Sequence, residues 1–256
     1  MSRTGSAPGT GQAPSLPIIY AVRMEQKWPS QLVIVRHGQS ERNAAKDAAK
    51  ASGKPEINRT GLRDVDTPLT AWGNQQATAT GQYLAPRFQF DAVFTSPYKR
   101  TIDTTRALLS AYATQPPVIA EERIREIEFG ILDGLTWMGV KQKFPDEFAR
   151  REREGKYWYR PPGGESRPDV ALRVHSFLGT LTRDYRSQSV LVVCHSVVVL
   201  VFRRLLERWD EAQYLKVDAE DDVLNCSMTA YRYDADAGKL ALDHYNSVCY
   251  GEAASF

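Results

Sequence analysis

Two short apolar runs mark the chain, and polar residues follow each of them directly. Residues Leu32–Val35 are four consecutive apolar, mostly β-branched residues, and Ser189–Cys194 has the same character. Such runs are typical of strands buried on both faces of a parallel sheet that is covered by helices. The first run ends in Arg36 and His37, and the second ends in His195. Because ligands bind beyond the carboxyl ends of such strands, we expect the two histidines to face each other across one crevice.

Helical and extended patterns alternate through the rest of the chain. Helices are predicted at Ala71–Leu84, Thr101–Ser110, Thr136–Glu154 with a break at Phe144–Asp146, Asp169–Tyr185 and Val197–Arg208. Further strands are predicted at Phe90–Thr95, Val118–Ala120 as an edge strand, Met228–Tyr233 and Leu240–Tyr245. This alternation of strands and helices predicts an α/β fold.

The domain organisation follows from composition along the chain. Residues 1–16 are rich in Gly, Ser, Thr and Pro and are expected to form a disordered tail. No linker divides the remainder, so residues 17–256 are expected to be a single domain. Ile18–Val22 is either an added strand or precedes an ordered unit that starts near Met24. Residues 44–63 are expected to be a loop or partly helical excursion over the site.

Charge and cysteine content restrict the partners and the compartment. Thirty-three Lys and Arg against 31 Asp and Glu leave a net charge of +2, which gives no strong reason to bind nucleic acid or anionic membrane. No apolar run approaches the about 20 residues of a membrane span. The three cysteines, Cys194, Cys226 and Cys249, fit neither a disulfide framework nor a zinc site. We therefore expect a cytoplasmic protein without nucleic-acid or membrane partners; its oligomeric state, a homodimer included, stays open.

A third cation is predicted beside a helix N-terminus. In Thr95–Thr101, Ser96 is a good N-cap and Pro97 suits the first helical position, which places Arg100 on the first turn. A helix N-terminus next to a cation favours anion binding. The alternative is that Arg100 is a solvated charge on the helix surface.

Two carboxylates follow in the next segment. Glu126 and Glu128 bracket Ile127, and an extended backbone would send both side chains to the same side. A carboxyl group near a bound phosphoryl group can protonate a leaving alkoxide if its pKa is raised. The alternative is that both glutamates pair with Arg123 and Arg125 at the surface.

The motifs also occur in a familiar order. They are Arg36–Ser40 with Asn43, Ser96–Thr101, Glu126 four residues before Gly130, Gly164–Ser166 and Val192–His195. In this order they resemble the histidine phosphatase superfamily, also called phosphoglycerate-mutase-like, over about residues 31–233. The resemblance implies a three-layer sandwich in which helices flank a mostly parallel central sheet.

The resemblance also implies a role for each motif residue. His37 would be the nucleophile that accepts the phosphoryl group as phosphohistidine, and Glu126 would protonate the leaving group and then activate water. The phosphoryl oxygens would be held by Arg36, Arg100 and His195, with help from Asn43. This arrangement needs no metal or other cofactor, since two arginines and a second histidine supply the charge that magnesium supplies elsewhere.

Within the superfamily, the segments around Glu126 and Tyr157 resemble fructose-2,6-bisphosphatase domains and broad-specificity phosphatases. Arg151 and Lys156 match the basic positions that hold the sugar's other phosphate there, Arg151 only with a one-residue insertion in the alignment, so both are substrate-binding candidates. Ser196, a further candidate, stands where the bisphosphatase has glutamine, and Leu200 stands where it has an arginine. The loss of this cation argues against the same substrate. The Arg-His-Tyr that follows the glutamate in cofactor-dependent phosphoglycerate mutases is also absent.

Three hypotheses follow for the function. The first is a metal-independent phosphatase that hydrolyses a small phosphorylated metabolite, such as a sugar phosphate or phosphoglycerate, through phosphohistidine. The second is a mutase of the same fold, which must keep water away from the intermediate. The third is a non-catalytic phosphoester-binding protein, which would be expected to lack part of the catalytic set.

Overall fold

The computed structural model describes Met1 and residues 26–57 and 61–250. Apart from Met1, the predicted tail at 1–16, the domain boundary at residue 17 and the possible strand Ile18–Val22 lie outside the described residues. In the described part, no helix has the length and apolar character needed to cross a bilayer.

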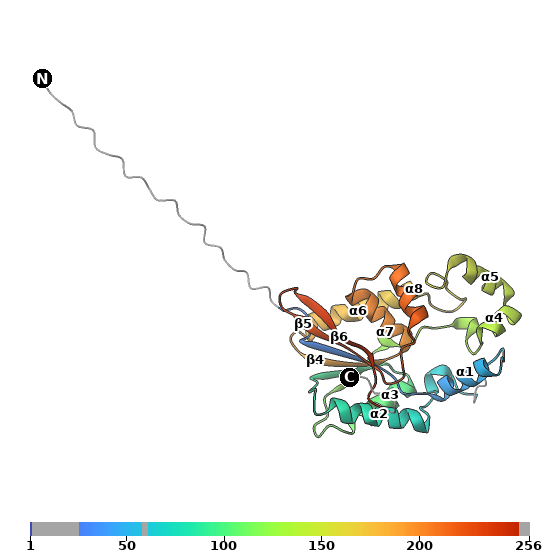
Figure 1. The fold of residues 1–256 in the computed structure, drawn as a ribbon, viewed down its shortest axis with the longest axis horizontal. Coiled ribbons are helices and arrows are strands. Elements are labelled where there is room, and N and C mark those ends of the chain that lie inside the picture. The colour runs from blue at the N-terminus through green and yellow to red at the C-terminus, as the bar shows by residue number, and fades with distance from the viewer. Residues whose placement is uncertain (2–25, 58–60, 251–256) are drawn as a thin grey trace.

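A single mixed sheet of six strands forms the centre of the described chain (Figure 1). The strand order is β3-β2-β4-β1-β5-β6. Its strands are β1 (Gln31–Arg36), β2 (Ala92–Thr95), β3 (Val118–Ala120), β4 (Ser189–Cys194), β5 (Met228–Asp234) and β6 (Lys239–Ser247). The first four strands in this order are parallel; β5 runs antiparallel to β1, and β6 runs antiparallel to β5 and so has the direction of the first four. The predicted mostly parallel α/β sheet is therefore confirmed, with β3 at its edge.

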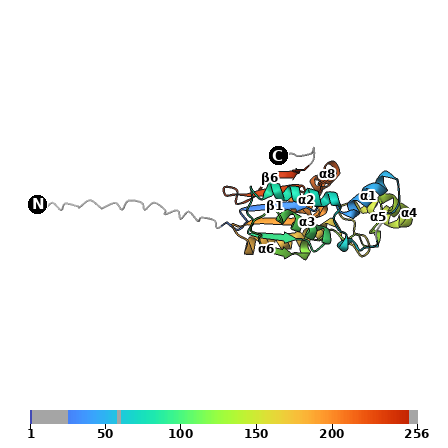
Figure 2. The same ribbon diagram turned by 90° about the horizontal axis from the view of Figure 1, so that it is seen from below.

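Helices cover both faces of the sheet (Figure 2). Alternate residues of β1 point to opposite faces, as in any strand. Leu32 and Ile34 join the core cluster that includes helices α6 (Arg167–Asp184) and α7 (Ser196–Leu206), while Val33 and Val35 join the cluster of α2 (Ala71–Leu84) and α3 (Lys99–Leu109). Burial of both faces explains why β1 and β4 are apolar throughout.

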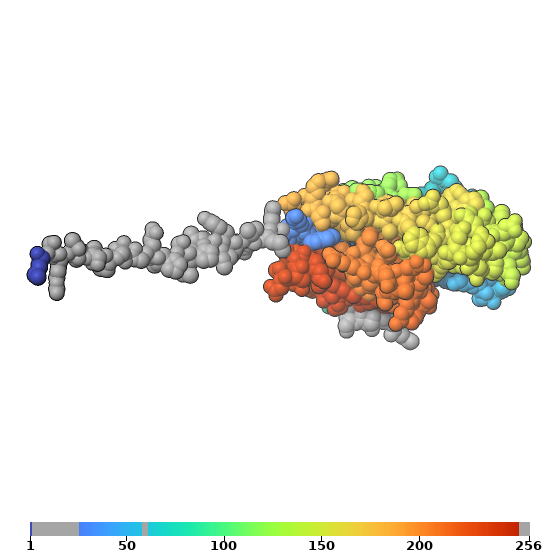
Figure 3. Space-filling model, turned by 90° about the horizontal axis from the view of Figure 1, so that it is seen from above, coloured from blue at the N-terminus to red at the C-terminus, as the bar shows by residue number. Residues whose placement is uncertain are grey.

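The remaining helices lie mainly around one end of the sheet. They are α1 (Glu41–Ala51), α4 (Trp137–Lys143), α5 (Pro145–Glu154) and α8 (Glu211–Glu220). The expected break near Phe144 separates α4 from α5, as predicted. Residues 44–51, expected to be loop or partly helical, belong to the regular helix α1, and α8 was not predicted. Helices α4 and α5 form one end of the molecule (Figure 3) and pack around a small apolar cluster of Leu132, Val140 and Tyr159.

Two glycines let the loop after β1 pack directly on α2. A Cβ atom on Gly38 would lie 2.4 Å from the carbonyl oxygen of Gly73, and one on Gly73 would lie 2.0 Å from the carbonyl oxygen of Gln39. Real Cβ atoms do not approach backbone so closely. Close packing of the two backbones therefore fixes the loop that follows His37.

We expect Gly73→Ala to destabilise the protein by about 1–3 kcal/mol, because the new methyl group forces the loop away from α2. Urea unfolding followed by circular dichroism measures this change. Gly179→Ala is the matched control, since a Cβ atom at that helical position meets nothing within 4 Å, and it should be neutral or stabilising by up to about 1 kcal/mol. Equal unfolding midpoints for the two variants would contradict the packing argument.

Candidate active site

The two strand-end histidines lie side by side. Strands β1 and β4 are adjacent and parallel, with Arg36 opposite Cys194, so His37 and His195 follow at the same level of the sheet. The backbone N–H of His37 donates to the carbonyl oxygen of Cys194 at 3.0 Å. Their imidazole ring centroids are 5.2 Å apart, and both side chains are buried. The two imidazoles therefore lie next to each other, as predicted.

His37 is held in one orientation with one ring nitrogen available. Its Nδ1 lies 2.7 Å from the carbonyl oxygen of Gly38, which can only accept a hydrogen bond, so Nδ1 carries the proton. Nε2 is then unprotonated, and its lone pair accepts the Nε–H of Arg100 at 3.3 Å. Burial, followed by the cations Arg100 and Arg36, lowers the pKa of His37 well below its usual value. The imidazole is therefore neutral and nucleophilic at Nε2.

Arg100 lies on the first turn of α3 and is buried. Its Nη1 and Nη2 atoms donate to the two carboxylate oxygens of Asp64 at 3.1 and 3.2 Å. Nη1 also donates to the Asp64 carbonyl oxygen at 2.8 Å. Asp64 thus aims the guanidinium at His37, so the alternative of a solvated helix charge for Arg100 is wrong.

His195 is fixed by Ser96. The Oγ of Ser96 lies 2.8 Å from Nε2 of His195, whereas the buried Nδ1 of His195 has no hydrogen-bond partner among the described residues. The prediction that Ser96 caps a helix was wrong, because α3 begins only at Lys99, after Tyr98. If the Ser96 hydroxyl donates to Nε2, Nδ1 carries a proton that it can donate to a bound oxyanion.

Arg36 and Asn43 complete the set around His37. Arg36 donates through Nη1 to the carbonyl oxygen of Val223, while its buried Nε has no partner among the described residues. Asn43 is part of a capping box with Ser40 at the start of α1. Asn225, which sequence analysis did not identify, donates to the carbonyl oxygen of His37 at 2.9 Å and to Oδ1 of Asn43 at 3.3 Å.

Glu126 and Glu128 have different surroundings. Glu126 lines the same cavity as His37, and its Oε1 accepts the backbone N–H of Ile127 at 2.9 Å. Burial raises the pKa of Glu126, although that N–H, Arg100 and Arg36 oppose the rise. Glu128 is exposed and is not among the residues that line the cavity. The alternative of surface pairs with Arg123 and Arg125 is wrong, because those arginines bind Glu121 and Glu165.

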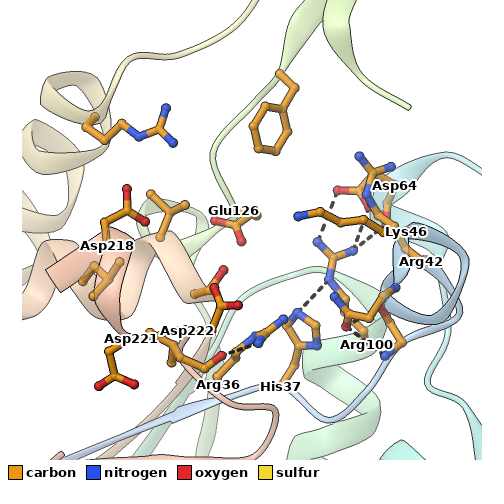
Figure 4. Close-up of a pocket in the computed structure, with 18 of the residues that line it drawn as sticks. Arg36, His37, Arg42, Lys46, Asp64, Arg100, Glu126, Asp218, Asp221 and Asp222 are labelled. Carbon is orange, nitrogen blue, oxygen red and sulfur yellow. Dashed lines mark hydrogen bonds and ion pairs between the residues drawn. The ribbon is translucent and has the colours of Figure 1, made fainter. Parts of the chain in front are cut away.

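Of these residues, Arg36, His37, Asn43, Arg100 and Glu126 line a cavity of about 360 Å³, whereas the fully buried His195 is not among the lining residues. Figure 4 shows Glu126 above His37 and Arg36, with Lys46 and Arg42 on one side and three aspartates on the other. The other lining residues are Ser40, Lys50, Asp64, Phe129, Lys156, Arg167, Ser196, Val197, Leu200, Asp218, Asp221, Asp222 and Val223. Within residues 26–57 and 61–250, no group of three or more His, Cys, Asp or Glu side chains is placed to hold a metal ion.

The predicted substrate-binding residues divide into two groups. Ser196 and Lys156 line the cavity, and so does Leu200, the position that lacks the bisphosphatase arginine. Arg151 does not line it: its guanidinium lies over the ring of Trp137, 4.2 Å from the centroid. The helix phase of α5 directs Arg151 toward α4, so the gapped alignment that suggested it was misleading.

Several lining residues escaped sequence analysis. Lys46 and Lys50 lie one turn apart on α1, and Arg167 begins α6. The spacing of the two lysines from Asn43, at three and seven residues, is the helical signal that would have found them. The aspartates lie on α8 and in the loop that follows it, and neither segment was predicted as part of the site.

The sequence is similar to those of phosphoryl-transfer enzymes. A phosphoglycerate mutase from Gloeobacter violaceus, described as 2,3-bisphosphoglycerate-dependent, is 35% identical over 211 residues, covering 80% of this chain and 86% of the mutase. A 6-phosphofructo-2-kinase/fructose-2,6-bisphosphatase from Aquarana catesbeiana is 31% identical over 198 residues, covering 76% of this chain. The chain spans about 40% of the length of that bifunctional relative.

Solved structures and a family model give the same result. A mycobacterial glucosyl-3-phosphoglycerate phosphatase in complex with inorganic phosphate superposes with a TM-score of 0.64 at 26% identity, covering 86% of this chain and 98% of the phosphatase. The model of the histidine phosphatase superfamily (branch 1) matches residues 32–246. The chain therefore belongs to the histidine phosphatase superfamily.

Proposed function

We propose that this protein is a metal-independent phosphatase that hydrolyses small phosphomonoesters through a phosphohistidine on His37. The observation that carries the proposal is the unprotonated Nε2 of His37 in a ring of fixed donors. This atom accepts the Nε–H of Arg100 at 3.3 Å, and the imidazole of His195 lies with its ring centroid 5.2 Å from that of His37. A neutral nucleophile surrounded by fixed donors suits attack on a phosphoryl group, whose transition state is stabilised mainly by positioning and positive charge.

The first step forms a nitrogen–phosphorus bond and breaks the ester oxygen–phosphorus bond. The Nε2 lone pair of His37 attacks phosphorus, while Arg36, Arg100 and the Nδ1–H of His195 bind the phosphoryl oxygens. The electron pair of the broken bond leaves with the ester oxygen, which takes a proton from Glu126. The raised pKa of Glu126 supports this role, because it increases the protonated fraction of the carboxyl group.

The second step returns the protein to its starting state. Ionised Glu126 removes a proton from a water molecule, the water oxygen attacks phosphorus, and the bond to Nε2 breaks. Covalent catalysis thus divides the hydrolysis into two displacements that use the same donors. The site also favours the small phosphorylated metabolites expected from the sequence, since the cavity holds about 360 Å³.

Phosphate release from p-nitrophenyl phosphate tests the proposal, together with trapping of acid-labile phosphate on the protein. We expect both without added metal and in the presence of a chelator. A mutase is the second candidate, because the Gloeobacter violaceus mutase is 35% identical. Isomerisation of 3-phosphoglycerate without net phosphate release would support the mutase, and failure to trap phosphate from any ester would favour a non-catalytic binding protein.

The pH dependence should carry the signature of Glu126. Its acid form is the proton donor, so kcat/KM for an alkyl phosphate should fall as pH rises through its raised pKa. The lowered pKa of His37 leaves the nucleophile neutral as pH falls, so we expect no loss from this group until well below neutrality. Rate profiles from pH 4 to 9 measure this; an alkaline fall that persists unchanged in Glu126→Gln would contradict it.

We also propose a cytoplasmic location. Cys194, Cys226 and Cys249 are all free thiols in the structure. Free cysteines are ordinary in a reducing compartment, and this supports the location.

A further inference from the structure

The catalytic cavity has walls of opposite charge. Asp218, Asp221 and Asp222 lie on one side of Glu126, and Lys46 lies on the other, with its ammonium group directed toward Glu126 (Figure 4). Lys50 lines the same side as Lys46, because both project from one face of α1. A leaving group bound above His37 therefore meets carboxylates in one direction and ammonium groups in the other.

The carboxylate side of the cavity does not favour a second anion. Lys156 is the cation there that the sequence suggested as an anion ligand, and its Nζ lies 2.6 Å from Oδ2 of Asp218. Asp221 and Asp222 add negative charge nearby, and Leu200 contributes no polar group. The three aspartates outnumber the two cations that line the cavity near α8, Lys156 and Arg167, so an anionic end of a substrate is less favoured there than beside the lysines of α1.

The two lysines of α1 form no close ion pair among the described residues. Among the described residues, neither Lys46 nor Lys50 forms a hydrogen bond or an ion pair with a carboxylate. Like charges four residues apart destabilise a helix, and the nearby carboxylate Glu126 offsets this only at longer range, without an ion pair to Lys46. Desolvation in the cavity, followed by the nearby cation Lys50, lowers the pKa of Lys46. A bound anion would relieve both effects.

A second hollow adjoins the catalytic cavity at the two lysines. Lys46 and Lys50 also line a neighbouring hollow of about 420 Å³, whose opposite wall includes Leu135, Trp137 and Met138. The two lysine Cα atoms differ by about 6 Å along the helix axis. A leaving group several carbons long can therefore extend from the phosphoryl site along α1.

We propose that Lys46 and Lys50 form a subsite for a second anionic group. The favoured substrates are then phosphomonoesters whose extended leaving group ends in a carboxylate or a phosphate. This inference rests on the proposed phosphatase activity, and it adds the direction and the charge of the leaving group.

Two substrates of equal length test the inference. 6-Phosphogluconate and sorbitol 6-phosphate share a six-carbon chain and differ only at the far carbon, which is a carboxylate in one and a hydroxymethyl group in the other. We expect kcat/KM to be about tenfold higher for 6-phosphogluconate, mostly through KM, as for a charge-assisted contact. In the Lys46→Gln, Lys50→Gln double variant this preference should fall to less than about twofold.

Two further variants separate the subsite from general effects of charge. Lys54→Gln removes a lysine that lines only the outer hollow, and the preference for 6-phosphogluconate should persist in it. Lys46→Arg combined with Lys50→Arg keeps both charges and should retain the preference.

The outcomes distinguish the two proposals. If the parent protein hydrolyses both sugar phosphates equally well, or if the double glutamine variant keeps the tenfold preference, the subsite is overturned. The subsite is also overturned if p-nitrophenyl phosphate is hydrolysed and neither sugar phosphate is. If no phosphomonoester is hydrolysed at all, the proposed function itself fails.

Discussion

Replacement of His37 by alanine should reduce phosphate release by at least about 10⁴-fold, which corresponds to about 5.5 kcal/mol of transition-state stabilisation. The variant lacks the Nε2 lone pair, so no covalent intermediate forms, and the remaining donors can only bind the ester. Steady-state hydrolysis of p-nitrophenyl phosphate measures the loss. Incubation with a ³²P-labelled ester should leave no acid-labile label on the variant.

His175→Ala is the matched control for this variant, because His175 is an exposed histidine on α6 that does not line the cavity. It should keep the parent activity and the label. His37 is buried, so thermal unfolding of His37→Ala must accompany the assay. A folded His37→Ala protein that still forms labelled phosphoprotein would show that another residue is the nucleophile.

Replacement of Glu126 by glutamine should affect esters according to their leaving groups. For an alkyl phosphate such as glycerol 3-phosphate, we expect kcat/KM to fall by about 10²–10⁴-fold, because the alkoxide leaves without a proton. For p-nitrophenyl phosphate, whose phenolate is a stable anion, bond cleavage needs little protonation and the loss should be much smaller. The ratio of the two losses is the quantity to measure.

Glu128→Gln is the matched control, since Glu128 is two residues away, exposed and outside the cavity lining. It should change neither substrate's rate appreciably. If Glu126→Gln lowers both rates by the same factor, Glu126 acts on binding or positioning and another group supplies the proton.

The sequence predicted the part of the site that the sheet determines. The apolar runs of β1 and β4 indicated buried parallel strands, and their ends brought His37 and His195 together. A strand buried on both faces accepts almost only apolar residues, so its sequence alone identifies it, without knowledge of the segments that pack against it. Arg100 was also predicted, because a cation beside a helix N-terminus is a local signal.

Contacts between distant segments were not predictable in the same way. Ser96 has the chemistry of a helix cap, yet its hydroxyl is bound to His195, and only the three-dimensional structure brings the two together. The ion pair of Lys156 with Asp218 depends on α8, whose apolar pattern is too weak to predict a helix. Arg151 was misplaced because rotation about the axis of α5 determines its direction, which a gapped alignment does not fix.

Helix α1 illustrates a different limit. Its residues are mostly small or charged, with only Ala49 buried, so the periodic apolar signal that identifies a core helix is almost absent. Ser40 and Asn43 form the capping box of this helix. In the sequence they were interpreted only as part of the phosphate-binding motif, not as the start of a helix. Because the helix was not recognised, Lys46 and Lys50 were not recognised as neighbours in the cavity.

The pairing of β1 with β4 joins two segments that are far apart in the sequence, residues 31–36 and 189–194. During synthesis, a ribosome must therefore complete most of the polypeptide before the two imidazoles can meet. Incomplete or misregistered chains consequently lack the reactive pair, and a one-residue slip of either strand would turn its side chains to the opposite face. During refolding, the recovery of enzymatic activity should therefore report when the whole sheet has assembled. Intrinsic fluorescence would report local structure and would not detect this step.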